Sequence, residues 1–138
     1  MKIAIINGPN LNLIGSRETD IYGGESFEQY FNKIRKKYEN IDFDYYQSNV
    51  EGELINELQR AALKMDGIIL NAGAYTHTSI AIGDAIAAIK VPVVEVHISN
   101  IEAREEFRKY SHITAKCAGT IFGFGIKGYM LAVESFLK

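Results

Sequence analysis

One arginine and one tyrosine stand in the polar segment NGPNLNLIGSRETDIY, which covers residues 7–22 and could carry acid–base chemistry. A phenol has a pKa near 10, so it is a poor base at neutral pH unless its surroundings stabilise the phenolate. Arg17 could lower the pKa of Tyr22 in this way, because a guanidinium attracts the phenolate. Glycines at positions 15, 23 and 24 would let residues 15–24 close as a lid. The alternative is that both side chains lie idle on a surface loop.

A second acid–base candidate is His97, which ends the apolar run VVEVH at residues 93–97. If this run is a strand, alternation puts Glu95 and His97 on the same side. A carboxylate in so apolar a strand needs a partner, and Glu95 could hold the imidazole in one tautomer and favour its charged form. Such an imidazole suits a general acid. A structural Glu–His pair without a catalytic role is an equally good interpretation.

Three further basic side chains are candidates for binding a substrate. His77 precedes a predicted helix start, so it is either a site residue or a loop histidine beside a helix cap. Arg104 and Arg108 are four residues apart on a predicted helix that follows Ser99, so they share a face. They could hold a carboxylate with help from the amides of Ile98 and Ser99. Pairing with neighbouring surface glutamates is the alternative for both arginines.

The elements that must position these side chains alternate between strand and helix along the chain. Strands are predicted near 2–7, 41–46, 67–71, 92–97 and 118–122, and helices near 26–38, 52–65, 79–89, 102–110 and 126–137. This alternation predicts one α/β domain over residues 1–138, with a flavodoxin-like, doubly wound parallel sheet of five strands in the order 2-1-3-4-5 and helices on both faces. The loops after strands 1, 3 and 4 then meet at one sheet edge, which brings the polar candidates together.

The predicted helix at 79–89 is apolar nearly all round, with Asp84 as its only acid. One face of a sheet cannot bury such a helix completely, so a second burying surface is needed. We therefore expect this helix to lie at a subunit interface.

Size and composition are those of an ordinary soluble domain. The chain has 138 residues, 47% of them hydrophobic, and a net charge of −2, which argues against a nucleic-acid or acidic-lipid partner. The single cysteine, Cys117, cannot form an intramolecular disulfide, and no Asn-x-Ser/Thr acceptor is present. No signal peptide or membrane-spanning segment is predicted, so we expect a cytoplasmic protein.

Several sequence motifs of well-known sites are present only in part. The GxGxxG pattern at residues 123–128 has no following strand and no acid for a ribose, which favours close packing of a strand against a helix. Glu95, His77 and His97 lack the spacing of a metal site, and no nucleophile elbow surrounds Ser79. Strands 1 and 3 end in asparagine, whereas the magnesium site of a phosphoryl-accepting receiver domain needs carboxylates.

Four blocks of the sequence resemble one enzyme family. They are NGPNLNLIGSRE with IYGG, NAGAYTHTSIAIGDA, VEVHISNIEAREEFRKYS and GFGIKGY, and in content, order and spacing they are similar to type II 3-dehydroquinate dehydratases. The resemblance covers nearly the whole chain. It implies a flavodoxin-like fold and a lyase that dehydrates 3-dehydroquinate to 3-dehydroshikimate, by anti elimination through an enolate, in the shikimate route to aromatic amino acids. It implies no cofactor, metal or Schiff base.

The resemblance also implies roles for individual residues. Tyr22 looks like the base that removes the C2 proton, and Arg17 like the residue that lowers the pKa of that phenol and closes with the lid. His97 looks like the acid that protonates the departing C1 hydroxyl, and Asn10 like the residue that holds an enolate-stabilising water. Six further residues match substrate-binding positions of the family: Asn71, His77, Asp84, Ile98, Ser99 and Arg108.

The same resemblance implies a homododecamer built as a tetramer of trimers, in which Asp84 approaches a neighbouring subunit's site. Two residues depart from the family pattern. Thr19 stands where proline is usual, which could loosen the lid, and Ala74 stands where some members have a second glycine. Neither change removes a chemical group.

The main alternative function is a non-catalytic, flavodoxin-like module that binds a nucleotide or a flavin. Its anion-binding loop would need glycines or hydroxyl groups. This chain has Pro9, Asn10 and Leu11 at that place, which disfavours the alternative.

Overall fold

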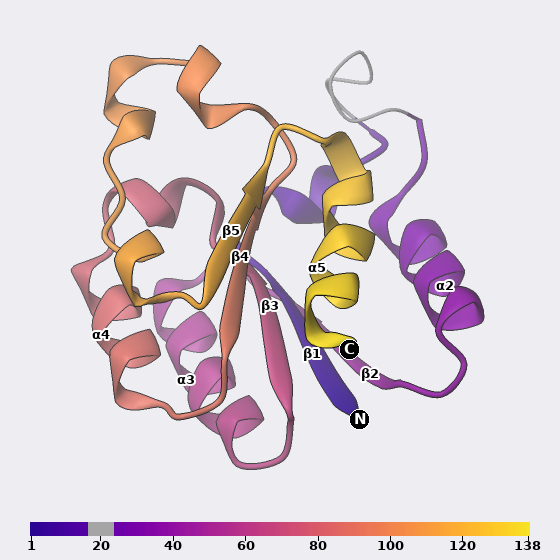
Figure 1. The fold of residues 1–138 in the computed structure, drawn as a ribbon. Helices are drawn as coiled ribbons and strands as arrows, with labels where there is room; N and C mark the ends of the chain where they lie inside the picture. Colours follow the sequence, from indigo (N-terminus) through magenta and orange to yellow (C-terminus); the bar gives the residue numbers. More distant parts are fainter. Residues whose placement is uncertain (17–23) are drawn as a thin grey trace.

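Five short runs of mostly apolar residues form one parallel sheet in the computed structural model, which describes residues 1–16 and 24–138 (Figure 1). The strands are β1 (Lys2–Asn7), β2 (Asp42–Gln47), β3 (Gly67–Asn71), β4 (Val93–His97) and β5 (Gly119–Phe122). Their order in the sheet is β2-β1-β3-β4-β5, so the predicted flavodoxin-like order is confirmed. In the register of β1 and β3, Asn7 lies opposite Asn71, so both strands end in an asparagine at the same level.

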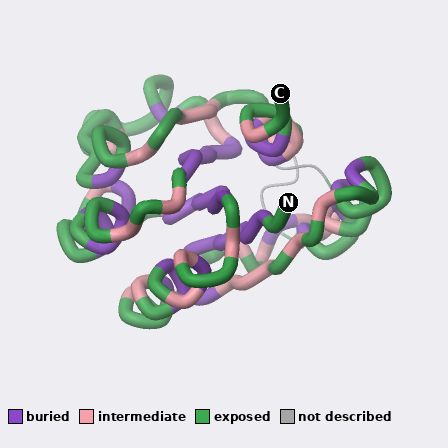
Figure 2. The backbone as a smooth tube through the Cα atoms, turned by 60° about the horizontal axis from the view of Figure 1, so that its bottom comes forward, coloured by how far each residue is buried: buried purple, intermediate pink, exposed green. Residues whose placement is uncertain are grey.

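Helices cover both faces of this sheet, and its three central strands, β1, β3 and β4, are the most buried part of the chain (Figure 2). Helices α2 (Phe27–Lys37) and α5 (Gly128–Phe136) lie on one face, and α3 (Glu51–Ala62) and α4 (Ile80–Ala88) lie on the other. Alternation along β1 divides its side chains between the two cores: Ile3 and Ile5 pack with α2 and α5, and Ala4 and Ile6 pack with α3 and α4.

Local sequence signals explain where these helices begin. Ser26 caps α2 with the predicted capping box, because its hydroxyl accepts from the Gln29 amide while the Gln29 side chain accepts from the Ser26 amide. Ser79 caps α4 and accepts from the amide of Ile82. These caps fix the starts of two helices at the ends of the loops that precede them.

The prediction of a helix at 102–110 is wrong. Two short 3-10 turns, Ile101–Ala103 and Glu106–Lys109, replace it, and Arg104 between them has an extended backbone. Of this whole segment only Ile101 is buried, so no apolar stripe is available to pack a longer helix against the sheet. The Glu and Arg residues have helical spacing, but spacing of charges alone does not hold a helix.

Helix α4 keeps an apolar outer face in the isolated chain. Ile82, Ala85 and Ile86 are buried against the sheet and α3, and Gly83 is buried against the backbone of His112, whereas Ile80 remains 63% exposed. As predicted, a single chain therefore leaves the outer face of α4 without a second surface to bury it. What covers this face stays a prediction.

The GxGxxG pattern at residues 123–128 has the packing role that its sequence context favoured. A Cβ atom at Gly128 would lie 3.3 Å from Val96 and 3.7 Å from Ile121, so α5 approaches the sheet closely there. Gly123 and Gly125 have φ angles of 92° and 63°, which glycine adopts at little cost. The pattern thus shapes the turn from β5 into α5.

No helix in the described residues is long and apolar enough to cross a membrane.

Candidate functional site

The carboxyl ends of β1, β3 and β4 surround a cavity of about 160 Å³. Its lining comes from the loops after these three strands, as the sheet order requires at a topological switch point. Residues from all three loops line it: Pro9, Asn10, Leu11, Leu13, Ile14, Asn71, Gly73, Ala74, His77, His97, Ile98, Ser99, Ile101, Arg104 and Arg108. The lining mixes aliphatic side chains with histidine, asparagine and arginine, a composition suited to a small polar ligand.

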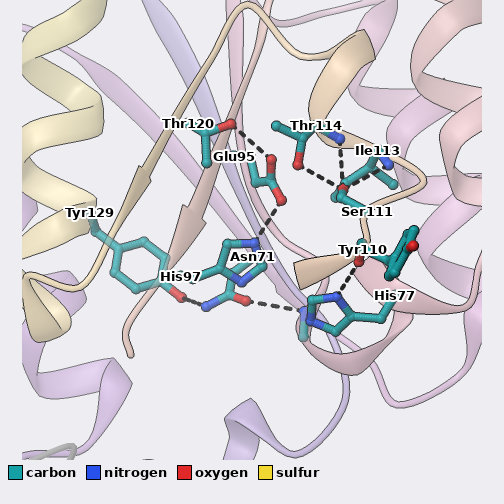
Figure 3. A network of polar contacts seen from close by, with 11 residues as sticks. Asn71, His77, Glu95, His97, Tyr110, Ser111, Ile113, Thr114, Thr120 and Tyr129 are labelled. Carbon is teal, nitrogen blue, oxygen red and sulfur yellow. Dashed lines mark hydrogen bonds and ion pairs between the residues drawn. The ribbon is translucent and has the colours of Figure 1, made fainter. Parts of the chain in front are cut away.

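His97 and Glu95 form a buried pair beside this cavity (Figure 3). His97 Nε2 lies 2.6 Å from Glu95 Oε1, so the predicted contact between the two side chains is confirmed. Both are enclosed, with Glu95 fully buried and His97 only 5% exposed. Because the carboxylate engages one ring nitrogen, the other nitrogen remains for the cavity that His97 lines.

Glu95 stays ionised despite its burial. Burial alone would raise the pKa of this carboxyl, but hydrogen bonds from His97, Thr114 and Thr120 outweigh it and hold the pKa below its usual value. The Thr120 hydroxyl donates to Glu95 Oε2 over 2.9 Å. A fixed negative charge therefore sits directly behind His97, where it offsets the positive charge of an imidazolium.

His77 approaches the same space from the loop after β3. Its ring stacks near that of His97, with centroids 6.3 Å apart. His77 Nδ1 donates to the backbone carbonyl of Tyr110 over 2.6 Å, because a carbonyl oxygen can only accept. Burial lowers the pKa of His77, and the nearby charges of His97 and Arg108 lower it further. Neutral His77 thus presents Nε2 as a hydrogen-bond acceptor for a ligand hydroxyl.

Asn10 has a left-handed backbone with φ of 69°, which makes it the only non-glycine residue with positive φ in the described residues. Asparagine tolerates this conformation better than most residues. The Asn10 amide donates to Asn49 Oδ1 over 3.0 Å, and Gln47 Nε2 donates to the same oxygen and to the Gly8 carbonyl. Gln47, at the end of β2, and Asn49, in the loop after it, thus hold the loop after β1 in place.

The two arginines of the third loop both line the cavity, although not through the shared helix face that was predicted. Arg108 Nε donates to Glu105 Oε2 over 2.5 Å, and Arg104 Nη1 donates to Ser99 Oγ over 3.3 Å. The alternative of pairing with neighbouring glutamates is therefore realised at Arg108, and Arg104 Nε also lies 3.9 Å from Glu105 Oε2. The remaining guanidinium N–H groups can still meet an anionic ligand.

The structure brings seven of the predicted site residues together and places Asp84 elsewhere. Lining the cavity are Asn10, Asn71, His77, His97, Ile98, Ser99 and Arg108. Asp84 lies apart, exposed on α4, where its carboxylate is 3.9 Å from Lys116 Nζ. Arg17 and Tyr22, with Thr19 and most of the predicted lid at 15–24, lie outside the described residues. Ala74, the other departure from the family pattern, is exposed at the cavity.

Sequence reasoning missed the residues that stand behind the cavity. Thr114 and Thr120 bond to Glu95, and Tyr129 of α5 bonds to Asn71. The only local signal is a tyrosine beside the apolar run Met130–Val133 of α5, where it is fully buried. In residues 1–16 and 24–138, no group of three or more His, Cys, Asp or Glu side chains could hold a metal ion.

The sequence model of the family described as dehydroquinase class II matches residues 1–137. The chain belongs to the class II dehydroquinase family. Among relatives of this dehydroquinase is the 3-dehydroquinate dehydratase of Fusobacterium nucleatum, which is 56% identical, with 100% of this chain and 97% of the relative covered. The corresponding protein of Caldicellulosiruptor bescii is 53% identical, with 96% and 93% covered.

Solved structures agree with this family assignment. The crystal structure of the type II dehydroquinase from Butyrivibrio crossotus superimposes with a TM-score of 0.95 at 48% identity, covering 100% of this chain and 98% of that one. The type II dehydroquinase from Propionibacterium acnes gives a TM-score of 0.92 at 37% identity, with 98% and 94% covered.

The buried pair yields a stability prediction for Glu95→Gln. The pKa of Glu95 is lower in the folded chain than in the unfolded chain, so its contribution to stability is present above about pH 4.5 and is lost as pH falls through the lower, folded value. We expect the variant to be less stable than the parent at pH 7, with a gap that narrows below pH 4.5. Urea unfolding at a series of pH values measures this gap.

Glu102→Gln, which removes an exposed carboxylate, is the control for losing one negative charge. A stability gap for Glu95→Gln that is constant or wider at low pH would contradict the ionised, hydrogen-bonded carboxylate.

Proposed function

We propose that this chain catalyses the dehydration of 3-dehydroquinate to 3-dehydroshikimate, a step of the shikimate route to aromatic amino acids. The observation that carries the proposal is the Glu95–His97 pair, buried at a cavity whose lining includes most of the residues that the sequence resemblance assigns to substrate binding. Relatives at 53–56% identity over nearly their whole length are named for this reaction, which supports the same activity here.

His97 is the general acid of the proposed mechanism. Loss of the C1 hydroxyl requires a proton on the departing oxygen, and an imidazolium delivers it at neutral pH. The ionised Glu95 orients the ring and stabilises its positive charge, since the two side chains are in direct contact. The second ring nitrogen is then available to the substrate.

Tyr22 and Arg17 supply the base in this proposal. Tyr22 takes the C2 proton as phenolate, and Arg17 favours that phenolate. The enolate that results is stabilised through a water held by Asn10, whose backbone is fixed at the cavity edge. Arg17 and Tyr22 fall within the proposed lid at 15–24, so lid closure and activation of the base become one event.

The remaining cavity residues bind the substrate's hydroxyls and carboxylate. Arg108, with the amides of Ile98 and Ser99, suits the carboxylate because all three offer N–H donors. His77 offers an acceptor and Asn71 an amide for hydroxyl groups. Each step is a proton transfer or an elimination within the substrate, so the proposal includes no cofactor or metal.

A flavodoxin-like nucleotide or flavin module is the weaker candidate. The cavity volume of about 160 Å³ suits a small ring compound better than a flavin. The residues that follow β1 are Pro9, Asn10 and Leu11, whereas a phosphate loop needs glycine or hydroxyl side chains. A yellow purified protein, or a rise in melting temperature with nucleotides, would favour this alternative.

Mixing the purified protein with 3-dehydroquinate tests the proposed function. We expect near-ultraviolet absorbance from the conjugated product at neutral pH. The same assay should show kcat reduced by about 10²–10⁴ in Tyr22→Phe and in His97→Ala, since each lacks one proton-transfer group.

Tyr46→Phe and His112→Ala are the matched controls. Tyr46 lies on β2 and His112 is exposed, and neither lines the cavity. An inactive parent protein would overturn the proposed function, and full activity in either site variant would overturn that residue's role.

We further propose that the protein is a homododecamer, a tetramer of trimers, in which α4 lies at an interface and Asp84 approaches a neighbouring subunit's site. The exposed apolar face of α4 and the position of Asp84 away from its own cavity support this assembly. A cytoplasmic location is also proposed, on the basis of the single, partly buried cysteine.

Sedimentation at micromolar concentration tests the assembly with Ile80→Asp. Asp at the first position of α4 favours the helix but places a charge on its apolar outer face, so we expect the oligomer to dissociate. Leu63→Lys, at the exposed end of α3, is a control that should leave the oligomer intact. A monomeric parent protein would contradict the proposal.

A further inference from the structure

Three side chains from distant parts of the chain form a directed hydrogen-bond relay behind the cavity. Asn71 Nδ2 donates to the Tyr129 hydroxyl over 3.0 Å, and that hydroxyl donates to Asn7 Oδ1 over 2.7 Å. Asn71 Oδ1 accepts from the amide of Gly73 over 3.1 Å. Figure 3 shows Tyr129 reaching from α5 to Asn71.

The direction of every bond in this relay is determined by elementary chemistry. The Gly73 amide can only donate, so the Asn71 atom facing it must be the carbonyl oxygen. The other end of that amide is then the NH₂ group, and Tyr129 must accept from it. Because the Tyr129 proton is consequently directed at Asn7, Asn7 must offer its oxygen. A reversed amide at Asn71 would break two of these three bonds.

The three hydrogen-bonded side chains are not the most stable arrangement that this part of the core could have. All three side chains are buried, and Asn7 Nδ2 lies buried without a hydrogen-bond partner in the described residues. An unpaired buried donor is destabilising. A packed apolar residue at position 7 would avoid it, but would leave the Tyr129 hydroxyl without its acceptor.

We propose that Tyr129 is a positioning residue of the active site, which acts through Asn71. The relay uses one N–H of Asn71 and fixes the orientation of its amide, so the second N–H remains as a donor on the cavity side. An oriented donor of this kind selects a hydroxyl or carbonyl oxygen of the bound substrate. Tyr129 itself does not line the cavity. This inference rests on the proposed dehydratase activity.

Tyr129→Phe removes the single oxygen at the centre of the relay and keeps the ring that fills the core. We expect KM for 3-dehydroquinate to rise about tenfold while kcat changes less than about threefold, because the lost interaction orients a binding group. Tyr38→Phe is the matched control. It removes another core phenol, which donates to Glu134 away from the cavity, so it should lower the melting temperature without changing KM.

Asn7→Leu provides a second variant that does not depend on the stability of Tyr129→Phe. It removes the acceptor of the relay together with the unpaired Nδ2 donor, so we expect little loss of stability. The Tyr129 hydroxyl then lacks its acceptor at position 7 and can rotate toward Asn71, which weakens the bond that it accepts from Asn71 Nδ2, while the Gly73 amide still faces Asn71 Oδ1. KM should rise severalfold in this variant as well.

The experiments distinguish failure of the proposed function from failure of the proposed role of Tyr129. An inactive parent protein would overturn the proposed function. An active parent protein whose KM is unchanged in the folded Tyr129→Phe and Asn7→Leu variants would overturn the relay alone.

Side-chain amide NMR gives a readout independent of activity. The Asn71 NH₂ signals should exchange slowly with solvent in the parent and rapidly in Tyr129→Phe, and equal exchange rates would also overturn the relay.

Discussion

A buried negative charge inside the parallel sheet is the constraint on which the site depends. Glu95 has no exposure to solvent, and placing an isolated carboxylate there would cost several kcal/mol. Hydrogen bonds from His97, Thr114 and Thr120 offset this cost and keep the carboxylate ionised. Since strand geometry places residues 95 and 97 on one side, β4 itself holds the imidazole at the cavity. His97, the proposed proton donor, is therefore also a hydrogen-bond partner of the buried Glu95 carboxylate.

The parallel sheet imposes a second constraint, which acts on the neighbouring strands. β1 and β3 are in register, so their last residues, Asn7 and Asn71, end at one level. The polar ends of these strands are buried beneath α5 and need partners, and the phenol of Tyr129 bonds to both. Close approach of α5 to β4 and β5 at Gly128 brings that phenol within reach. The GFGIKGY segment thus connects helix packing to the cavity without lining it.

Features with a local physical cause could be predicted from the sequence. The strand order followed from alternating elements, and the start of α2 followed from Ser26 and Gln29. The pairing of Glu95 with His97 followed from the two-residue period of a strand. The segment at 102–110 misled the prediction because its charges have helical spacing without an apolar stripe.

Contacts made only by the tertiary fold were not predictable. Tyr129 meets its partners across 58 and 122 residues of sequence, and nothing near it in the chain indicates which polar group it reaches. Asp84 is another such case, since within one chain it is exposed and lies near Lys116, away from the cavity.

Turnover of 3-dehydroquinate by Glu95→Gln tests the central claim most directly. The variant keeps the size of the side chain but removes the negative charge that contacts His97. The account predicts that kcat falls by about 10² or more while KM changes little, because the charge acts on proton transfer rather than on substrate binding. A kcat within about threefold of the parent value would contradict it.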